Sequence, residues 1–164
     1  MNSTLPRWLA PFSLGLGLVL SVRPAGAITP RETALHAIGL KTITAIATGN
    51  YAYISSIVDP QGIYVGHDGV KHTAATFRDD LTHRTGLYCE LFEKGCKTDH
   101  NPGYTLGHAF NAPGWPRGAD LKSKIDGDDG TVECWEFGGK GDLIATLSYR
   151  FDGGKWYLYN IYYV

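Results

Sequence analysis

The chain has 164 residues, 15 basic and 16 acidic side chains, and a formal net charge of −1. This length suits one domain with a sizeable hydrophobic core. A nearly neutral chain with scattered lysines does not attract phosphate backbones, so we expect no nucleic-acid partner. The sequence carries no recognisable catalytic or binding signature, and we expect no cofactor.

The first 27 residues have the order typical of a secretory signal peptide. Arg7 precedes an apolar run over residues 9–22, and Ala25-Gly26-Ala27 follows it. The run is too short for a helix that spans a bilayer, which needs roughly 20 residues. We therefore expect cleavage after Ala27 and a secreted or periplasmic protein whose mature chain does not insert into the membrane. A buried N-terminal helix is the alternative.

Residues 28–164 are then a single α+β domain. The leader takes two arginines and no acidic residue with it, so the net charge of the remaining chain falls from −1 to −3.

Three cysteines remain in the mature chain, at positions 89, 96 and 134. In an oxidising compartment nearby thiols usually pair, and closing the short loop between Cys89 and Cys96 would stabilise the fold by roughly 2.5 kcal/mol. The sequence therefore predicts a structural disulfide between these two. Cys134 is either a small buried hydrophobe or the rival partner. A zinc site is the weaker alternative, because no C-x2-C pair is present, and we predict no metal.

The mature chain opens with complete helix signals. Thr29 and Glu32 form a capping box, and Gly49 can end the helix in a left-handed conformation. A second short helix is predicted over residues 51–58, before Asp59-Pro60.

A tight hairpin is predicted next, with Asp68-Gly69 as a type I′ turn. Val65 then lies opposite His72, and His67 lies diagonally across from His72 on the same face. Diagonal neighbours sit about 7 to 8 Å apart, within reach of two imidazoles that converge on one ligand. Two solvated histidines are the simpler interpretation.

Residues 76–86 are predicted to form a capped helix, with Thr76 and Asp79 as its capping box and Gly86 at its end. Asp79 and Asp80 are adjacent, so they point about 100° apart and would not share a proton as a catalytic dyad. Complementarity to the helix dipole explains the charges of this helix.

Residues 97–118 are rich in Gly, Pro and Asn, with a short strand predicted over residues 104–110. Long irregular segments in compact domains are often functional, and this one could cover a pocket or meet a partner. An ordinary surface loop is the alternative. The candidate ligand-binding residues are Tyr104, His108, Phe110, Trp115 and Arg117.

Three antiparallel strands are predicted at the end of the chain, over residues 131–137, 142–151 and 155–164. The last is apolar or aromatic on both sides apart from Asn160, so it should be central in its sheet. Residues 126–130, DGDDG, fail the spacing of a calcium loop and predict a turn.

The segments ETALHAIGLKTITAIATGNYAYISSIVDPQGIYV and GDLIATLSYRFDGGKWYLYNIYYV carry a family resemblance. Their order of helices and strands resembles the nuclear transport factor 2-like cone fold, also called SnoaL-like. The resemblance implies N-terminal helices packed on a curved antiparallel sheet that encloses a cavity. Members include isomerases, dehydratases, small-ligand binders and interaction domains. Their enzymes commonly place an aspartate and a histidine or tyrosine inside the cone, and no such pair aligns onto this chain.

Three functions follow as hypotheses. The first is a non-catalytic module that binds a small molecule or an envelope protein with the cone cavity and the loop at 97–118. Its ten tyrosines favour recognition. The second is a cofactor-independent isomerase or hydrolase that uses a His/Asp pair. The third is a protein inhibitor or structural envelope partner that acts through a strand edge. The candidate catalytic residues are His67, Asp68, His72 and His108.

Overall fold

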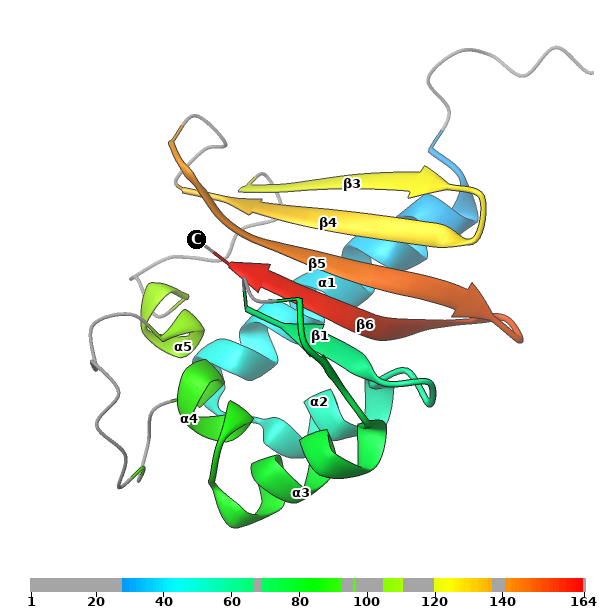
Figure 1. Cartoon of the computed structure of the whole chain (residues 1–164). Helices are drawn as coiled ribbons and strands as arrows, with labels where there is room; N and C mark the ends of the chain where they lie inside the picture. The colour runs from blue at the N-terminus through cyan, green and yellow to red at the C-terminus, as the bar shows by residue number, and fades with distance from the viewer. Residues whose placement is uncertain are drawn as a thin grey trace, which may run out of the picture.

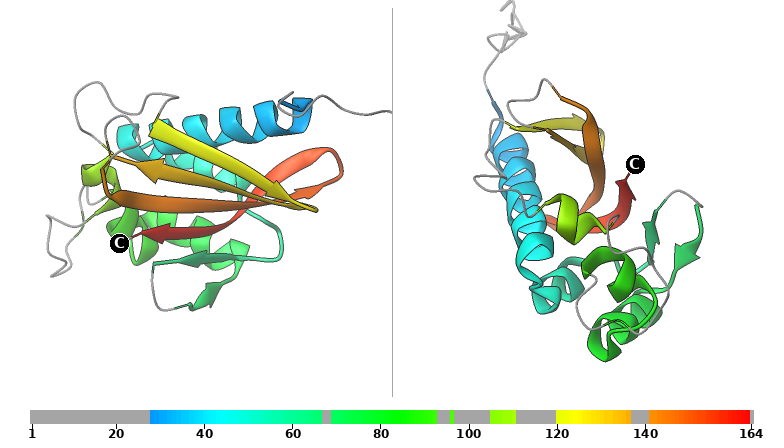
Figure 2. Two further views of the ribbon diagram at one scale, coloured as in Figure 1. Left: turned by 90° about the horizontal axis from the view of Figure 1, so that it is seen from above. Right: turned by 90° about the vertical axis from the view of Figure 1, so that its left-hand side faces the viewer.

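The computed structural model describes residues 28–66, 69–92, 96, 105–110, 120–136 and 141–163. In these residues, helices pack on one side of a curved six-stranded sheet (Figures 1 and 2). The helices are α1 Pro30–Thr48, α2 Tyr51–Ile57, α3 Ala74–His83, α4 Leu87–Phe92 and α5 Leu106–Ala109. The strands are β1 Ile63–Val65, β2 Lys71–His72, β3 Leu121–Asp126, β4 Asp129–Trp135, β5 Leu143–Asp152 and β6 Lys155–Tyr163. The predicted α+β class is confirmed.

The strand order is β2-β1-β6-β5-β4-β3. Neighbouring strands are antiparallel except for β1 and β6, which run parallel, so the sheet is mixed where we expected only antiparallel pairs. β6 lies between β1 and β5, which confirms its predicted central place. The turn predicted at residues 126–130 joins β3 to β4.

Helix α1 lies across the inner face of the sheet and contacts β3 and β4. It begins and ends as predicted: the Thr29 side chain accepts from the Glu32 N–H, the Glu32 carboxylate accepts from the Thr29 N–H, and Gly49 has a φ of 72°. The two elements approach very closely at Gly39, where a Cβ atom would lie 2.7 Å from a methyl group of Val132. Only a glycine fits this contact.

A buried hydrogen-bond chain also joins α1 to the sheet. The hydroxyl of Tyr149, on β5, donates to Thr42 Oγ1 over 2.9 Å, and Thr42 donates to the Ile38 carbonyl over 2.8 Å. Burial raises the pKa of Tyr149 well above its ordinary value, so the phenol stays protonated and remains a donor. Both polar groups are therefore satisfied inside the core.

The predicted register of the β1–β2 hairpin is wrong by two residues. Ile63, and not Val65, lies opposite His72. The expected diagonal pairing of His67 with His72 depended on that register. His67 and Asp68 lie outside the described residues.

Pairing with β6 explains the difference. β1 is hydrogen-bonded to β6 as well as to β2, with Val65 opposite Ile161. Gly66 then leaves the strand with a φ of 82°, and its N–H donates to the Ile161 carbonyl. The strand ends at Val65, where its pairing with β6 ends, three positions before Asp68.

Helix α3 begins three residues earlier than predicted. Its N-cap is Thr73, whose hydroxyl accepts from the Thr76 N–H over 3.0 Å, so the expected Thr76 and Asp79 capping box does not form. The earlier start buries Ala74 and Phe77 in the core. The helix also ends earlier, at His83, and its C-cap residue Arg84 has a φ of 58°.

Residues 106–109 form the short helix α5, and the strand predicted over residues 104–110 is wrong. Leu106 and Phe110 are both buried, and residues four positions apart lie on the same side in a helix and also in a strand. The apolar pattern therefore does not distinguish a helix from a strand here. A Cβ atom at Gly107 would lie 2.8 Å from the Leu91 carbonyl oxygen, so α5 sits directly against α4.

The predicted disulfide is confirmed. Cys89 is bonded to Cys96, with their Cα atoms 5.6 Å apart. Cys134 is free and fully buried, and burial raises the pKa of its thiol far above the ordinary value. Within the described residues, no helix is both long enough and apolar enough to cross a membrane.

We predict that Gly39→Ala destabilises the protein despite the better helix propensity of alanine. That propensity is worth about 1 kcal/mol, whereas overpacking against the stiff Val132 side chain costs about 1 to 3 kcal/mol. Urea unfolding should show a net loss of roughly 1 kcal/mol. In a Val132→Ala background the same change should become neutral or stabilising. An equal loss in both backgrounds would mean that the close contact does not limit the packing of α1.

Candidate functional site

A polar pocket of about 300 Å³ lies on the outer face of the sheet, away from α1. Adjacent residues of a strand point to opposite faces, so Tyr149, which bonds to α1, places Arg150 on the outer face. Asp129 is the cross-strand partner of Arg150 and joins it there. The described residues that line this Asp59–Arg150 pocket are Asp59, Gln61, Gly62, Tyr64, Lys71, Asp129, Arg150 and Tyr159.

Asp59 and Arg150 form the base of the pocket. Arg150 Nη2 donates to Asp59 Oδ1 over 2.8 Å, and the Gln61 N–H donates to the same oxygen over 2.7 Å. The Asp59 side chain is only 1 % exposed, whereas that of Arg150 is 28 % exposed. The carboxylate is therefore enclosed, and the guanidinium bridges it to the open part of the pocket.

The chain that carries Asp59 is fixed by the sheet and by a tight turn. The Asp59 N–H donates to the Leu158 carbonyl of β6, and the Gly62 N–H donates back to the Asp59 carbonyl. Gly62 has a φ of 109°, and a Cβ atom there would lie 2.5 Å from the His72 carbonyl oxygen. Glycine is thus required for this turn to pass beneath β2.

Tyr159 reaches the pocket because of a β-bulge. Ser148 pairs with Asn160 but Tyr149 pairs with Leu158, so Tyr159 is the extra residue of β6. Burial raises the pKa of Tyr159, the negative charge of Asp129 raises it further, and a hydrogen bond with Ser148 partly opposes them. The Tyr159 phenol is therefore neutral at ordinary pH and offers both a donor and an acceptor.

The remaining lining groups add charge and an aromatic surface. Lys71 Nζ lies 5.7 Å from the centroid of the Tyr64 ring. With Lys71 and Arg150 opposed by Asp59 and Asp129, the pocket holds two charges of each sign. Such a set can hydrogen-bond both ends of a polar molecule.

The side chains that line this pocket are carboxylates, cations, an amide and phenols, which can bind a ligand by hydrogen bonds and ion pairs. Its described lining contains no histidine, serine or cysteine. Among the residues that the structure describes, no three His, Cys, Asp or Glu side chains are grouped to hold a metal ion. The chemistry at hand is recognition by hydrogen bonds and ion pairs.

Neither of the two candidates whose side chains the structure describes, His72 and Phe110, lines this pocket. His72 is partly buried in β2, and Phe110 is fully buried in the core. Residues 67, 68, 104, 115 and 117 lie outside the described residues, and the side chain of His108 does too. Their catalytic and ligand-binding roles stay predictions.

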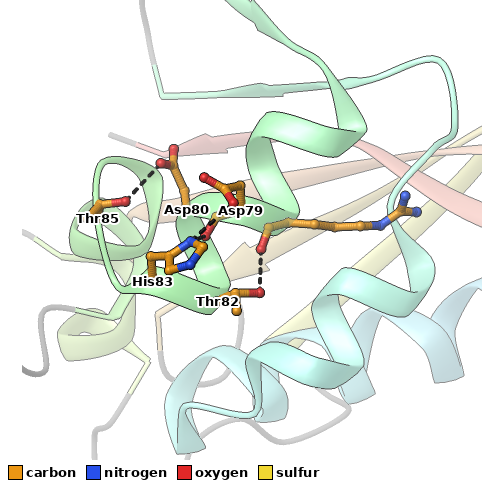
Figure 3. A network of polar contacts seen from close by, with 6 residues as sticks. Asp79, Asp80, Thr82, His83 and Thr85 are labelled. Atoms are coloured by element: carbon orange, nitrogen blue, oxygen red, sulfur yellow. Dashed lines mark hydrogen bonds and ion pairs between the residues drawn. The ribbon is translucent and has the colours of Figure 1, made fainter.

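Polar contacts at the end of α3 explain its charges without a catalytic role (Figure 3). His83 Nδ1 lies 3.1 Å from an oxygen of Asp79. The Asp80 carboxylate instead accepts from the Thr85 hydroxyl and from the Leu87 N–H. The two aspartates thus have separate partners, and it is the Asp80 carboxylate that links the end of α3 to the start of α4.

The pocket residues were missed because each has an ordinary local explanation. Asp59 precedes a proline, which predicts the end of a helix, and Arg150 lies within the strand predicted over residues 142–151. The available signal was the side of the strand: Arg150 follows Tyr149, which predicts opposite faces. The sequence contains no signal that pairs Arg150 with Asp59, 91 positions away.

Comparison with known proteins adds a distant structural likeness. No protein-family model matches the chain, and no curated protein sequence matches it. The CamKII hub homology domain of Chlamydomonas reinhardtii resembles the structure with a TM-score of 0.45 and 16 % sequence identity. The match covers 82 % of this chain and 96 % of that chain.

We predict that Arg150→Gln destabilises the fold by about 2 kcal/mol or more, because it leaves the enclosed Asp59 carboxylate without its cation. Adding Asp59→Asn should recover part of this loss, so a double-mutant cycle should give a coupling energy of at least about 1 kcal/mol. Chemical denaturation measures it, with the exposed Lys155→Gln as a control within about 0.5 kcal/mol of wild type. If the effects of the two substitutions were independent and additive, the proposed interaction of Asp59 with Arg150 at the base of the pocket would be contradicted.

Proposed function

We propose that this protein is an exported, non-catalytic binding module. Its Asp59–Arg150 pocket binds a small polar ligand that carries both donor and acceptor groups and is about as large as an amino acid or a monosaccharide. The observation that supports this proposal is the convergence of charged and phenolic side chains from separate strands around an Arg150 that an enclosed carboxylate holds in place.

The pocket suits a ligand that carries both hydrogen-bond donors and acceptors, and it suits a simple anion less well. Asp59 already occupies one face of the Arg150 guanidinium, and Asp129 faces it across the strands. A lone phosphate or carboxylate would meet two carboxylates beside the two cations. A zwitterion or a polyhydroxyl compound can instead donate to the acids while it accepts from Lys71 and Arg150.

The geometry also favours binding over turnover. The guanidinium and the carboxylate at the base are held to each other, and the Tyr159 phenol is protonated, so neither a nucleophile nor a general base is exposed at the base of the pocket. Fixed partners lower the entropy cost of ordering the site around a ligand. The loop at 97–118, with Tyr104, Trp115 and Arg117, remains a second proposed contact surface.

The ligand proposal is tested by nuclear magnetic resonance titration of the labelled protein with free amino acids and monosaccharides at millimolar concentrations. We expect at least one to shift resonances of Tyr64, Lys71 and Tyr159. The Lys71→Ala variant should bind it about tenfold more weakly, because one charged hydrogen bond is lost. Lys155→Ala, a change at an exposed lysine that does not line the pocket, is the matched control. Shifts that are absent, or that Lys71→Ala leaves unchanged, would rule out this pocket as the binding site.

Two features support export. The first 27 residues have the charged, apolar and small-residue segments of a signal peptide in that order. The disulfide also supports it, because disulfides persist in oxidising compartments. We predict that the protein, produced with its leader in a secreting host, begins at Ile28. Native protein should show no thiol that reacts with a thiol reagent, and denatured protein should show one, which Cys134→Ala removes. A retained leader, or three reactive thiols in freshly isolated protein, would contradict export.

A further inference from the structure

β3 is the last strand in the order of the sheet. Within the described residues its only neighbour in the sheet is β4. The two strands are joined by a two-residue turn, because Asp126 pairs with Asp129, and Gly127 has the positive φ, 60°, of a type II′ hairpin. Such a turn is closed by a hydrogen-bonded pair, and hydrogen-bonded pairs alternate along the ladder.

The alternation decides which main-chain groups face outward. Counting back from Asp126, Lys124 and Lys122 bond to β4, whereas Ser123 and Ile125 direct their N–H and C=O groups to the free edge. This edge can therefore accept the main chain of another strand.

A groove runs beside the same edge. It has a volume of about 540 Å³ and lies between α1 and β3, which are side by side when the sheet is viewed onto this edge (Figure 2, left). Ile28, Ala37 and Leu40 supply its apolar surface. His36 Nδ1 and Ser123 Oγ, 3.2 Å apart, connect its two walls.

The charges of the edge favour one kind of partner. Lys122 and Lys124 are exposed on the outer face of β3, and Lys122 is held 4.0 Å from the centroid of the Trp135 ring. If two copies of this chain paired through β3 around Ser123, Lys122 would face Lys124 of the other copy. Lysines on an edge strand oppose such self-pairing, whereas an acidic strand would find complementary charges.

We propose that the β3 edge and its groove bind an extended segment of another protein in which acidic residues alternate with small apolar residues. Side chains of an added strand point alternately to the two faces. The acidic ones would face Lys122 and Lys124, and the apolar ones would enter the groove against Ala37 and Leu40. This surface is separate from the Asp59–Arg150 pocket, whose lining comes from the turn before β1 and from strands other than β3.

The test uses the full mature chain and a labelled, end-capped peptide of alternating Glu and Val, followed by fluorescence anisotropy. We expect it to bind, and a Lys/Val peptide of equal length to bind at least about tenfold more weakly. Ser123→Pro should abolish binding, because proline removes an outward N–H without touching the ladder to β4. Lys155→Ala, which changes neither the β3 edge nor the groove, should bind like wild type.

Lys124→Glu gives an independent arm that does not disturb the backbone, so it decides the question if Ser123→Pro does not fold. It should reverse the preference toward the Lys/Val peptide, whereas Lys155→Glu should not. The proposal is overturned if neither peptide binds, or if Ser123→Pro binds as the wild-type protein does. Sedimentation showing a dimer of this chain that Ser123→Pro dissociates would also overturn it, in favour of a second copy as the occupant.

Discussion

The close packing of α1 on the inner face of the sheet is the constraint on which the rest of the structure depends. Two glycines permit it, one from each side. Gly39 of α1 faces Val132, and Gly130 of β4 faces Leu35 and the Trp156 ring, each without room for a Cβ atom. The contact is made specific by the buried Tyr149–Thr42 hydrogen bond, which would be costly to leave unmade in a shifted arrangement. Small residues set the distance between helix and sheet, and one polar contact sets their register.

This packing decides where binding surfaces can form. At these contacts the inner face is filled by α1, so polar side chains of β4, β5 and β6 collect on the outer face. In β5, adjacent side chains point to opposite faces, so Tyr149 lies in the core and Arg150 lies on the outer face. The bulge between Ser148 and Tyr149 then turns Tyr159 of β6 toward the same region. A core contact and a pocket contact are thus made by neighbouring residues, so changes to the core would be felt in the pocket.

Local signals predicted the elements whose ends are decided by nearby residues. α1 has a capping box and a C-terminal glycine, and the apolar pattern of β6 required a central place. The wrong predictions concern elements whose register or ends depend on a distant strand or on a second possible N-cap residue. The β1–β2 register is set by β6, and Thr73 wins over Thr76 as N-cap because the earlier start buries Ala74 and Phe77. β3 was missed because lysines and Asp126 make its sequence, LKSKID, weakly apolar, as suits an edge.

The candidate site was out of reach for a more general reason. Its residues come from a turn and several strands, and each type is common on protein surfaces. What makes them a site is a set of non-local constraints: the Leu158 carbonyl that holds Asp59, the glycine that lets the turn pass β2, and the bulge that turns Tyr159. None of these is a pattern within a short window of sequence. A pocket assembled in this way forms only with the completed sheet, so local unfolding of β1 or β6 would remove the binding surface before it exposed the packing of α1 on β3 and β4.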